Sequence, residues 1–285
     1  VMTKEIISAI DNCPQQSSPN FMGIDTTLGG GGHSYELLKK FPLLKIIGID
    51  QDPYARQAAT IKLNEFKNRI NIKAANFADF EPKEKVAFVI ADLGVNSFQI
   101  DQPERGFSFQ KDGPLDMRMD PSLAINAEEL INNLNEKELA DLIYKYGEER
   151  LSRKIARKIK RDLFEKGSYK STKELAYAIG GCFPPGQRYK KIHPATRTFQ
   201  ALRIGVNKEI ESLEKLLFKS PNWLLPEGII AIISFHSIED RKVKENFKTN
   251  NKLLNLTKKP IIPKDIEIQS NKRSRSAKMR IAKLK

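Results

Sequence analysis

The residues best suited to bind a small ligand are four consecutive glycines, Gly29 to Gly32, followed by His33. A glycine-rich turn between a strand and a helix lets a ligand approach the backbone and places it at the helix N-terminus. The triphosphate-binding pattern G-x-x-x-x-G-K-[ST] is absent, because no lysine follows the run. The dinucleotide pattern G-x-G-x-x-G also fails, because its last position falls on Ser34 or Tyr35. The turn therefore favours a nucleoside ligand other than these two.

Acidic side chains follow two of the expected strands. Asp50 lies 18 residues after Gly32, about the spacing at which an acid on the second strand meets a ribose. A carboxylate accepts hydrogen bonds from both ribose hydroxyls and complements a cationic sulfonium. Phe77 and Asp92 end the next two strands, and in a parallel sheet such ends line one crevice. The pattern predicts S-adenosylmethionine as the cofactor; the alternative, a plain loop and acids that only cap helices, stays open at this point.

The elements that must position these residues alternate along the chain. Strands are expected over 21–25, 44–50, 70–77, 85–95 and 228–235, with a helix over 52–66. Strand and helix in alternation predict an α/β fold with a parallel sheet covered on both faces. Helical patterns alone fill 127–179, and one further helix is expected from Pro194 to Ser220. We expect a sheet domain over 1–104 and 196–285, interrupted by a helical domain over 105–195.

Composition narrows the class of partner. The 285 residues include 49 basic and 35 acidic side chains, a net charge of +14 that attracts polyanions. Only Cys13 and Cys182 are present, without histidines at ligand spacing, so no disulfide framework and no metal site are expected. No apolar run is long enough to cross a membrane, and the first residues do not resemble a signal peptide. We expect a cytoplasmic protein with a polyanionic partner.

The positive charge is concentrated in two segments. From Arg150 to Arg161, seven of twelve residues are basic, and Leu151, Ile155 and Ile159 form a stripe at helical spacing. The second segment, Asn271 to Lys285, has seven basic residues and no acid. A single charge run is usually only a solvated face, but two runs and the overall excess favour nucleic acid or an anionic membrane surface. Both segments are expected to bind the phosphates of a nucleic acid without recognising its base sequence.

Longer motifs resemble one known family, the bacterial 16S ribosomal RNA cytosine-N4 methyltransferases. The matching segments are DTTLGGGGHS, GIDQDPYA, DLGVNSFQIDQPERGFSFQKDGPLDMRMD, YGEER, HPATRTFQALRIGVN, ISFHSIEDRKVK and RSRSAKMRIA. The family usually has Asp-Gly-Thr at 25–27 and Ser-Ser-Pro-Gln at 96–99, where this chain has Asp-Thr-Thr and Asn-Ser-Phe-Gln. It also has a His-x-Pro-Val segment at its start, so we expect residues to precede Val1.

The resemblance implies a Rossmann-like class I methyltransferase sheet with an inserted all-α domain. It implies methylation of the N4 amine of a decoding-centre, P-site cytidine in 16S rRNA within the small subunit, and it allows a homodimer. Neither a membrane nor a metal is implied. Carried over position by position, the cofactor contacts are Gly31, Gly32, His33, Asp50, Phe77, Asp92 and Gln99.

Asp92 is the candidate catalytic residue, because an acceptor aimed at the N4 hydrogens stabilises the positive charge that develops on nitrogen. A target base must also leave its stack and enter a shaped pocket. Candidate substrate-binding residues are Arg105, Phe107, Phe109, Arg118, His193, Arg197 and His236. Asp92 could instead serve only the adenosine, and the aromatics could be core packing. A methyltransferase for another substrate and an RNA-binding assembly factor without activity are the alternatives.

Overall fold

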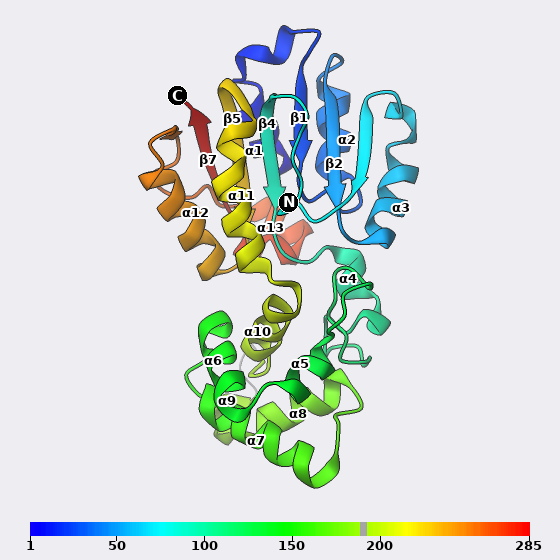
Figure 1. Ribbon diagram of the computed structural model, residues 1–285, viewed down its shortest axis with the longest axis vertical. Helices are drawn as coiled ribbons and strands as arrows, with labels where there is room; N and C mark the ends of the chain where they lie inside the picture. The colour runs from blue at the N-terminus through cyan, green and yellow to red at the C-terminus, as the bar shows by residue number, and fades with distance from the viewer. Residues whose placement is uncertain (189–192) are drawn as a thin grey trace. The chain divides into compact units, whose positions relative to one another are not determined.

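The computed structural model describes residues 1–188 and 193–285 (Figure 1). The chain forms two compact units, Val1–Gly94 with Ile210–Lys285, and Val95–Glu209. The predicted boundaries at 104/105 and 195/196 therefore differ from the observed ones, which lie at 94/95 and 209/210. The cause is helix α10, Thr196–Asn207, which packs on α5, Ala127–Asn133, and α6, Glu136–Gly147, of the inserted unit.

The first unit is built on a seven-stranded sheet in the order β3-β2-β1-β4-β5-β7-β6. The strands are β1 Met22–Asp25, β2 Lys45–Asp50, β3 Ile70–Ala74, β4 Val86–Asp92, β5 Leu224–Ser234, β6 Leu253–Asn255 and β7 Lys278–Leu284. Strands β1 to β5 pair in parallel, whereas β7 is antiparallel to both β5 and β6. This is the sheet of class I methyltransferases, as predicted.

Helices cover both faces of this sheet because its central strands are apolar throughout. In β4, every residue from Val86 to Ala91 is buried. One apolar cluster joins the sheet to α1, Thr3–Ile10, and α2, Gly32–Lys40. Another joins it to α11, Glu209–Trp223, and α12, Ser237–Thr249. The remaining elements of the unit are η1 Pro14–Ser17, α3 Pro53–Lys62, η2 Asn64–Phe66, α13 Asp265–Ser270 and η4 Lys272–Ser276.

A glycine on β1 makes room for the largest side chain of β4. Gly23 is the register partner of Phe88. A Cβ atom at Gly23 would lie 2.1 Å from the Phe88 ring, so only glycine fits under this ring. The ring is fully buried and packs edge-on against Phe21, with centroids 5.8 Å apart. The centre of the sheet therefore depends on this pair.

The second unit is helical over its described residues. Its remaining elements are α4 Ser97–Asp101, η3 Pro103–Arg105, α7 Ser152–Lys166, α8 Thr172–Gly181 and α9 Pro185–Arg188. Asn126 and Asn135 begin α5 and α6 with reciprocal capping boxes. The predicted stripe of α7 is confirmed, because Ile155 and Ile159 are fully buried in the core of this unit. The predicted all-α insertion is what the described part of this unit shows.

Two segments differ from the sequence-based prediction. The single helix expected over 194–220 is two helices, α10 and α11, because Lys208 adopts a left-handed backbone with φ of 49° between them. The last residues, expected as a basic phosphate-binding segment, contain β7. Among the described residues, no helix is long and apolar enough to cross a membrane.

Candidate functional site

The glycine turn joins β1 to α2 and requires glycine at two positions. Gly29 and Gly31 have φ angles of 52° and 78°, a region that other residues rarely adopt. Gly31 precedes the first residue of α2 and carries no capping side chain. The first helical N–H groups of α2 are therefore left for a ligand or for water.

Asp50 ends β2 and organises this turn. Its Oδ2 atom accepts a hydrogen bond from Gly29 N at 2.7 Å, and its Oδ1 atom accepts one from Asp52 N at 2.8 Å. Burial raises the pKa of Asp50, and the two backbone N–H groups oppose that shift. The carboxylate is thus fixed at the strand end, and its remaining lone pairs can accept from hydroxyl donors such as those of a ribose.

His33 lies in the first turn of α2 and is buried. Its Nε2 atom lies 2.7 Å from the carbonyl oxygen of Val1, and its Nδ1 atom lies 3.8 Å from Asp92 Oδ2. Burial lowers the pKa of His33, which favours a neutral ring that donates from Nε2 and keeps a lone pair on Nδ1. Instead of capping α2, His33 faces the carboxylate at the end of β4.

Asp92 is the last residue of β4, and its two carboxylate oxygens differ: Oδ2 lies 3.8 Å from the Val1 ammonium nitrogen, which opposes the rise in its pKa. The Oδ1 atom is buried and has no hydrogen-bond partner within the described ranges. Burial raises the pKa of Asp92 to about 6, and the nearby charges of Glu239 and Glu267 act in the same direction. The backbone N–H of Asp92 donates to Thr27 Oγ1 at 2.6 Å, which ties β4 to the glycine turn. This buried acceptor can take a hydrogen bond from a ligand or from a water molecule.

Two of the predicted cofactor contacts, Phe77 and Gln99, have packing or hydrogen-bond partners of their own. Phe77 follows β3 and is half-buried against apolar side chains of its own unit. Gln99 belongs to the helical unit, where its side chain accepts from Asn96 N at 3.0 Å and completes the capping box of α4. Gln99 therefore has a clear structural role, and its contact with a cofactor stays a prediction.

These residues fit an adenosyl cofactor. The first turn of α2 leaves backbone N–H groups for a ligand, Asp50 offers acceptors for a diol, and Asp92 Oδ1 is a buried acceptor that lacks a donor within the described residues. The sheet order β2, β1, β4 places these groups at the carboxyl ends of adjacent strands, where open α/β sheets bind ligands. Across residues 1–188 and 193–285, no group of three or more His, Cys, Asp or Glu side chains could hold a metal ion.

Of the predicted substrate residues, Arg105 and Arg118 have structural partners. Arg105 is 7% exposed and donates to the carbonyl oxygens of Arg118 and Met119 at 2.9 and 3.0 Å. Arg118 forms a two-pronged ion pair with Asp116, with the closest atoms 2.7 Å apart. Arg105 therefore has a clear structural role in its loop, and its contact with RNA stays a prediction.

Phe107, Phe109 and His193 lie at the surface of the helical core. The Phe109 ring packs on His193 with centroids 4.7 Å apart, and on Phe199 at 4.8 Å. Phe107 is half-buried against the same core. The structure thus brings Phe109 and His193 together, and His193 remains exposed enough to meet a substrate.

Arg197 and His236 lie in different units. Arg197, on α10, is exposed and donates to the carbonyl oxygen of Glu148 at 3.2 Å. His236 is the N-cap of α12, and its Nε2 atom lies 3.1 Å from Glu239 Oε1. His236 therefore follows β5 at the same edge of the sheet as Asp92, which pairs in register with Ile233.

The C-terminal basic segment is divided by β7. Arg280 is buried and forms an ion pair with Asp240, Nε to Oδ1, at 2.6 Å. The prediction that the whole segment holds phosphates is therefore wrong for Arg280, because its charge is neutralised inside the unit. Arg275 and Lys272, on η4, are exposed and remain available.

Sequence reasoning missed Thr27 and Glu239. Thr27 holds the backbone of Asp92, and buried Glu239 accepts from Phe235 N at 2.9 Å while its charge raises the pKa of Asp92. Thr27 lies within the glycine motif, and Glu239 stands three residues after His236, the spacing of a capping box. That spacing reveals the cap but not that the carboxylate lies close to Asp92.

Comparisons with known proteins show the family of the chain. A model of the MraW methylase family matches residues 1–285. A protein of Prochlorococcus marinus subsp. pastoris named ribosomal RNA small subunit methyltransferase H is 71% identical over 285 residues, covering 100% of this chain and 95% of that protein. A protein of the same name from Prochlorococcus marinus strain AS9601 is 70% identical over 284 residues, which cover 100% of this chain and 95% of that protein. A solved rRNA methylase of Streptococcus thermophilus aligns over 97% of this chain and 94% of its own, at 8% identity and a TM-score of 0.46. The family match and the two close relatives show that the chain belongs to the MraW methylase family.

Proposed function

We propose that this chain transfers a methyl group from S-adenosylmethionine to the N4 amine of a decoding-centre, P-site cytidine in 16S rRNA. Family membership and close relatives named as small-subunit rRNA methyltransferases support the reaction class. The observation that carries the proposal is the buried, unpartnered Oδ1 atom of Asp92 at the end of β4. It is the acceptor that an exocyclic amine would need.

The glycine turn, Asp50 and Phe77 would hold the cofactor. Bound there, S-adenosylmethionine supplies an activated methyl group on a sulfonium. Asp50 accepts from the ribose hydroxyls, and its own hydrogen bond from Gly29 keeps the turn open toward them. The protein then contributes chiefly alignment and the exclusion of water.

Asp92 would act on the cytosine N4 amine, which receives the methyl group. The lone pair of a cytosine N4 amine is delocalised into the ring, so the nitrogen is a poor nucleophile until its hydrogens are engaged by an acceptor. Asp92 Oδ1 accepts one N4–H and stabilises the positive charge that develops on nitrogen. The carboxylate, with a pKa raised to about 6, can hold the proton that the amine releases.

The exposed face of α7 would bind RNA phosphates. Arg150 precedes α7, and Arg153 and Lys154 lie in its first turn, all three exposed and without an ion pair to any described residue. Arg157 and Arg161 form exposed pairs with Glu136 and Glu165 at 3.3 and 3.9 Å, which contribute little and can be exchanged for phosphates. The exposed face of α7 would therefore contribute affinity for RNA that does not depend on its base sequence.

Removing the Asp50 carboxylate is expected to weaken the binding of S-adenosylmethionine. Asp50→Ala loses the acceptors for the ribose and frees Gly29 N. We expect at least a tenfold higher Kd, about 1.4 kcal/mol, measured by calorimetry. Asp79→Ala, an exposed acid of the same unit, is the control and should bind normally. An unchanged Kd in Asp50→Ala would show that the second strand does not carry the ribose contact.

Neutralising α7 is expected to weaken RNA binding in a salt-dependent way. For Arg153→Gln/Lys154→Gln, the slope of log affinity against log salt concentration should become shallower by about 2, one for each lost phosphate contact. Lys39→Gln/Lys40→Gln removes the same amount of positive charge from α2 and controls for the change in the net charge of the protein. Equal slopes in the two double variants would remove α7 from the RNA-binding surface.

Nucleoside mass spectrometry tests the reaction itself. Ribosomal RNA from a strain lacking this protein should contain no N4-methylcytidine at the target, and the purified protein should restore it. Adding the protein separately to small subunits and to naked 16S rRNA decides whether the assembled subunit is the substrate. Persistence of the nucleoside in the deletion strain would favour another substrate. Failure to bind S-adenosylmethionine would favour an assembly factor without activity.

The same proposal includes the cellular location and the oligomeric state of the protein. A ribosomal substrate places the protein in the cytoplasm, and sedimentation at several concentrations would reveal a homodimer. The excess of positive charge fits an RNA partner in either case.

A further inference from the structure

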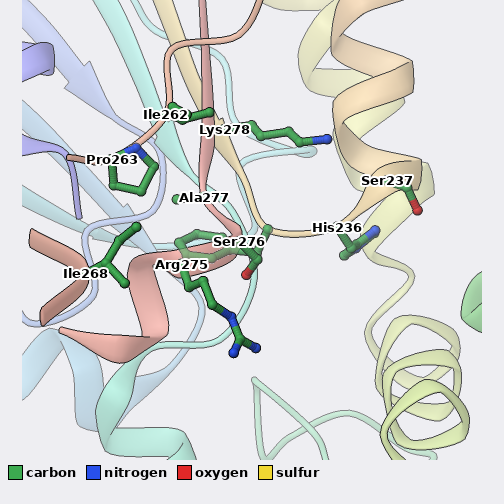
Figure 2. A pocket seen from close by; sticks show the side chains of 10 residues that line it. His236, Ser237, Ile262, Pro263, Ile268, Arg275, Ser276, Ala277 and Lys278 are labelled. Carbon is green, nitrogen blue, oxygen red and sulfur yellow. The ribbon is translucent and has the colours of Figure 1, made fainter. Parts of the chain in front are cut away.

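A pocket of about 280 Å³ lies in the sheet unit, outside the residues assigned to the cofactor (Figure 2). It is formed by the segment after β5, the approach to α13, and the residues from η4 into β7. The lining residues are Phe235, His236, Ser237, Ile262, Pro263, Ile268, Arg275, Ser276, Ala277 and Lys278. Its volume lies just below the usual range for small-ligand sites, so any ligand that it binds is small.

The sheet register places this pocket beside Asp92. Asp92 on β4 pairs with Ile233 on β5, and the next residue of β5, Ser234, pairs with Lys278 on β7. Two strand spacings separate Asp92 from Lys278, about 10 Å. A nucleotide in the pocket would therefore lie close to a base presented to Asp92, and the two could belong to one strand.

One part of the pocket is cationic. Arg275 is exposed and has no ion pair with any residue that the structure describes. Lys278 Nζ lies 3.5 Å from Asp240 Oδ2, but Arg280 already binds this carboxylate at 2.6 Å. Asp240 is thus shared by two cations, and Arg275 and Lys278 are the two basic side chains in the lining of the pocket. Figure 2 shows the Arg275 and Lys278 side chains on different sides of it.

The other part is apolar. Ile262 is 64% exposed, Ile268 is half-buried and Pro263 is buried. An inorganic anion would gain nothing from this surface, whereas the flat face of a nucleobase would cover it. The hydroxyl groups of Ser237 and Ser276 complete a lining suited to a ligand with an anionic and an apolar part.

We propose that this pocket binds one unpaired nucleotide of the substrate RNA adjacent to the target base. Its phosphate lies between Arg275 and Lys278, and its base lies against Ile262 and Ile268. This inference rests on the proposed function, and it adds a substrate contact that helps to hold the RNA extended while the target base is out of its stack.

Two matched pairs of variants test the pocket with small ribosomal subunits that lack N4-methylcytidine. Arg275→Gln and Lys45→Gln each remove one exposed charge from the sheet unit, but only Arg275 lines the pocket, whereas Lys45 lies at the start of β2. We expect Arg275→Gln to raise the KM for subunits about tenfold and Lys45→Gln less than twofold. Binding of S-adenosylmethionine should be unchanged in both variants.

The second pair tests the apolar wall. Ile262→Ser should raise the KM for subunits about fivefold, whereas Ile266→Ser, at a more exposed isoleucine outside the pocket, should not. Equal KM values within either pair would overturn the proposal. If the unsubstituted protein methylates neither subunits nor RNA, the proposed function fails instead, so the two failures are distinguishable.

Discussion

Replacing Asp92 with asparagine is expected to lower kcat for rRNA methylation at least about 100-fold, about 2.7 kcal/mol of transition-state stabilisation. Asparagine has nearly the same shape but cannot carry the negative charge that opposes a developing cation. Asp92 Oδ1 has no other donor within the described ranges, so the lost charge is not replaced. The measurement is a single-turnover assay at saturating cofactor.

The pH dependence of the same reaction follows from the raised pKa of Asp92. Burial raises this pKa to about 6, so the carboxylate is charged above pH 6 and protonated below it. Because only the charged form accepts the N4 proton, the rate should be full above about pH 7 and fall tenfold per pH unit well below 6. The Asp92→Asn variant should lose this dependence.

Asp11→Asn is the control, because Asp11 is an exposed acid of the same unit. It should retain full activity and the original pH profile. If Asp92→Asn kept more than a tenth of the original kcat, Asp92 would serve only to hold the adenosine. A flat profile between pH 5 and 7 in the unsubstituted protein would lead to the same conclusion.

Truncating Phe88 to alanine is expected to reduce the free energy of unfolding by about 3–5 kcal/mol, because it leaves a cavity in the centre of the sheet. Phe88 is fully buried and contacts Phe21. The measurement is urea unfolding followed by circular dichroism. Phe164→Ala removes an equal side chain that is 93% exposed, and should change the free energy of unfolding by less than about 0.5 kcal/mol.

The contact between Gly23 and Phe88 can be tested from the other side. Gly23→Ala should cost about 1–3 kcal/mol, because its Cβ would lie 2.1 Å from the ring. Combining it with Phe88→Leu should cost less than the sum of the single changes, since the smaller side chain leaves room for the new methyl group. Strict additivity would mean that the glycine is needed for another reason.

The sequence predicted most of the elements that repeat a simple pattern. The apolar runs over 44–50 and 85–95 are β2 and β4, because strands buried on both faces are apolar throughout. Helix α5 begins at Ala127, where the helical patterns were expected to begin, and Asn126 supplies its cap. These features depend only on neighbours along the chain.

Features that depend on distant partners were not predicted. The segment of β7 contains Lys278, Arg280 and Lys283, so its pattern indicated a basic surface rather than a strand. It is a strand because β5 and β6 pair with it on both sides and because Asp240 neutralises Arg280 inside the unit. The break at Lys208 is similar, since no proline or glycine marks it.

The positions of some residues of the candidate site were predicted, but the contacts between them were not. Asp50 and Asp92 could be placed at strand ends, but the approach of His33 Nδ1 to Asp92 at 3.8 Å depends on how α2 packs on the sheet. The resemblance to a family supplied His33 and Gln99, which no spacing rule selected. The burial of Arg105 could not be predicted, because an arginine in a loop is ordinarily exposed.

The place of the helical unit within the chain has a consequence for synthesis. Strand β4 pairs with β1 on one side and with β5 on the other, yet β5 begins only at Leu224, after the whole inserted unit. At roughly 5–20 residues per second, a ribosome needs on the order of ten seconds to reach it. During that interval the apolar β4 edge has no neighbour on one side, which is the arrangement most prone to aggregation. Folding of the inserted helices before β5 emerges would bring the two halves of the sheet together and shorten this exposure.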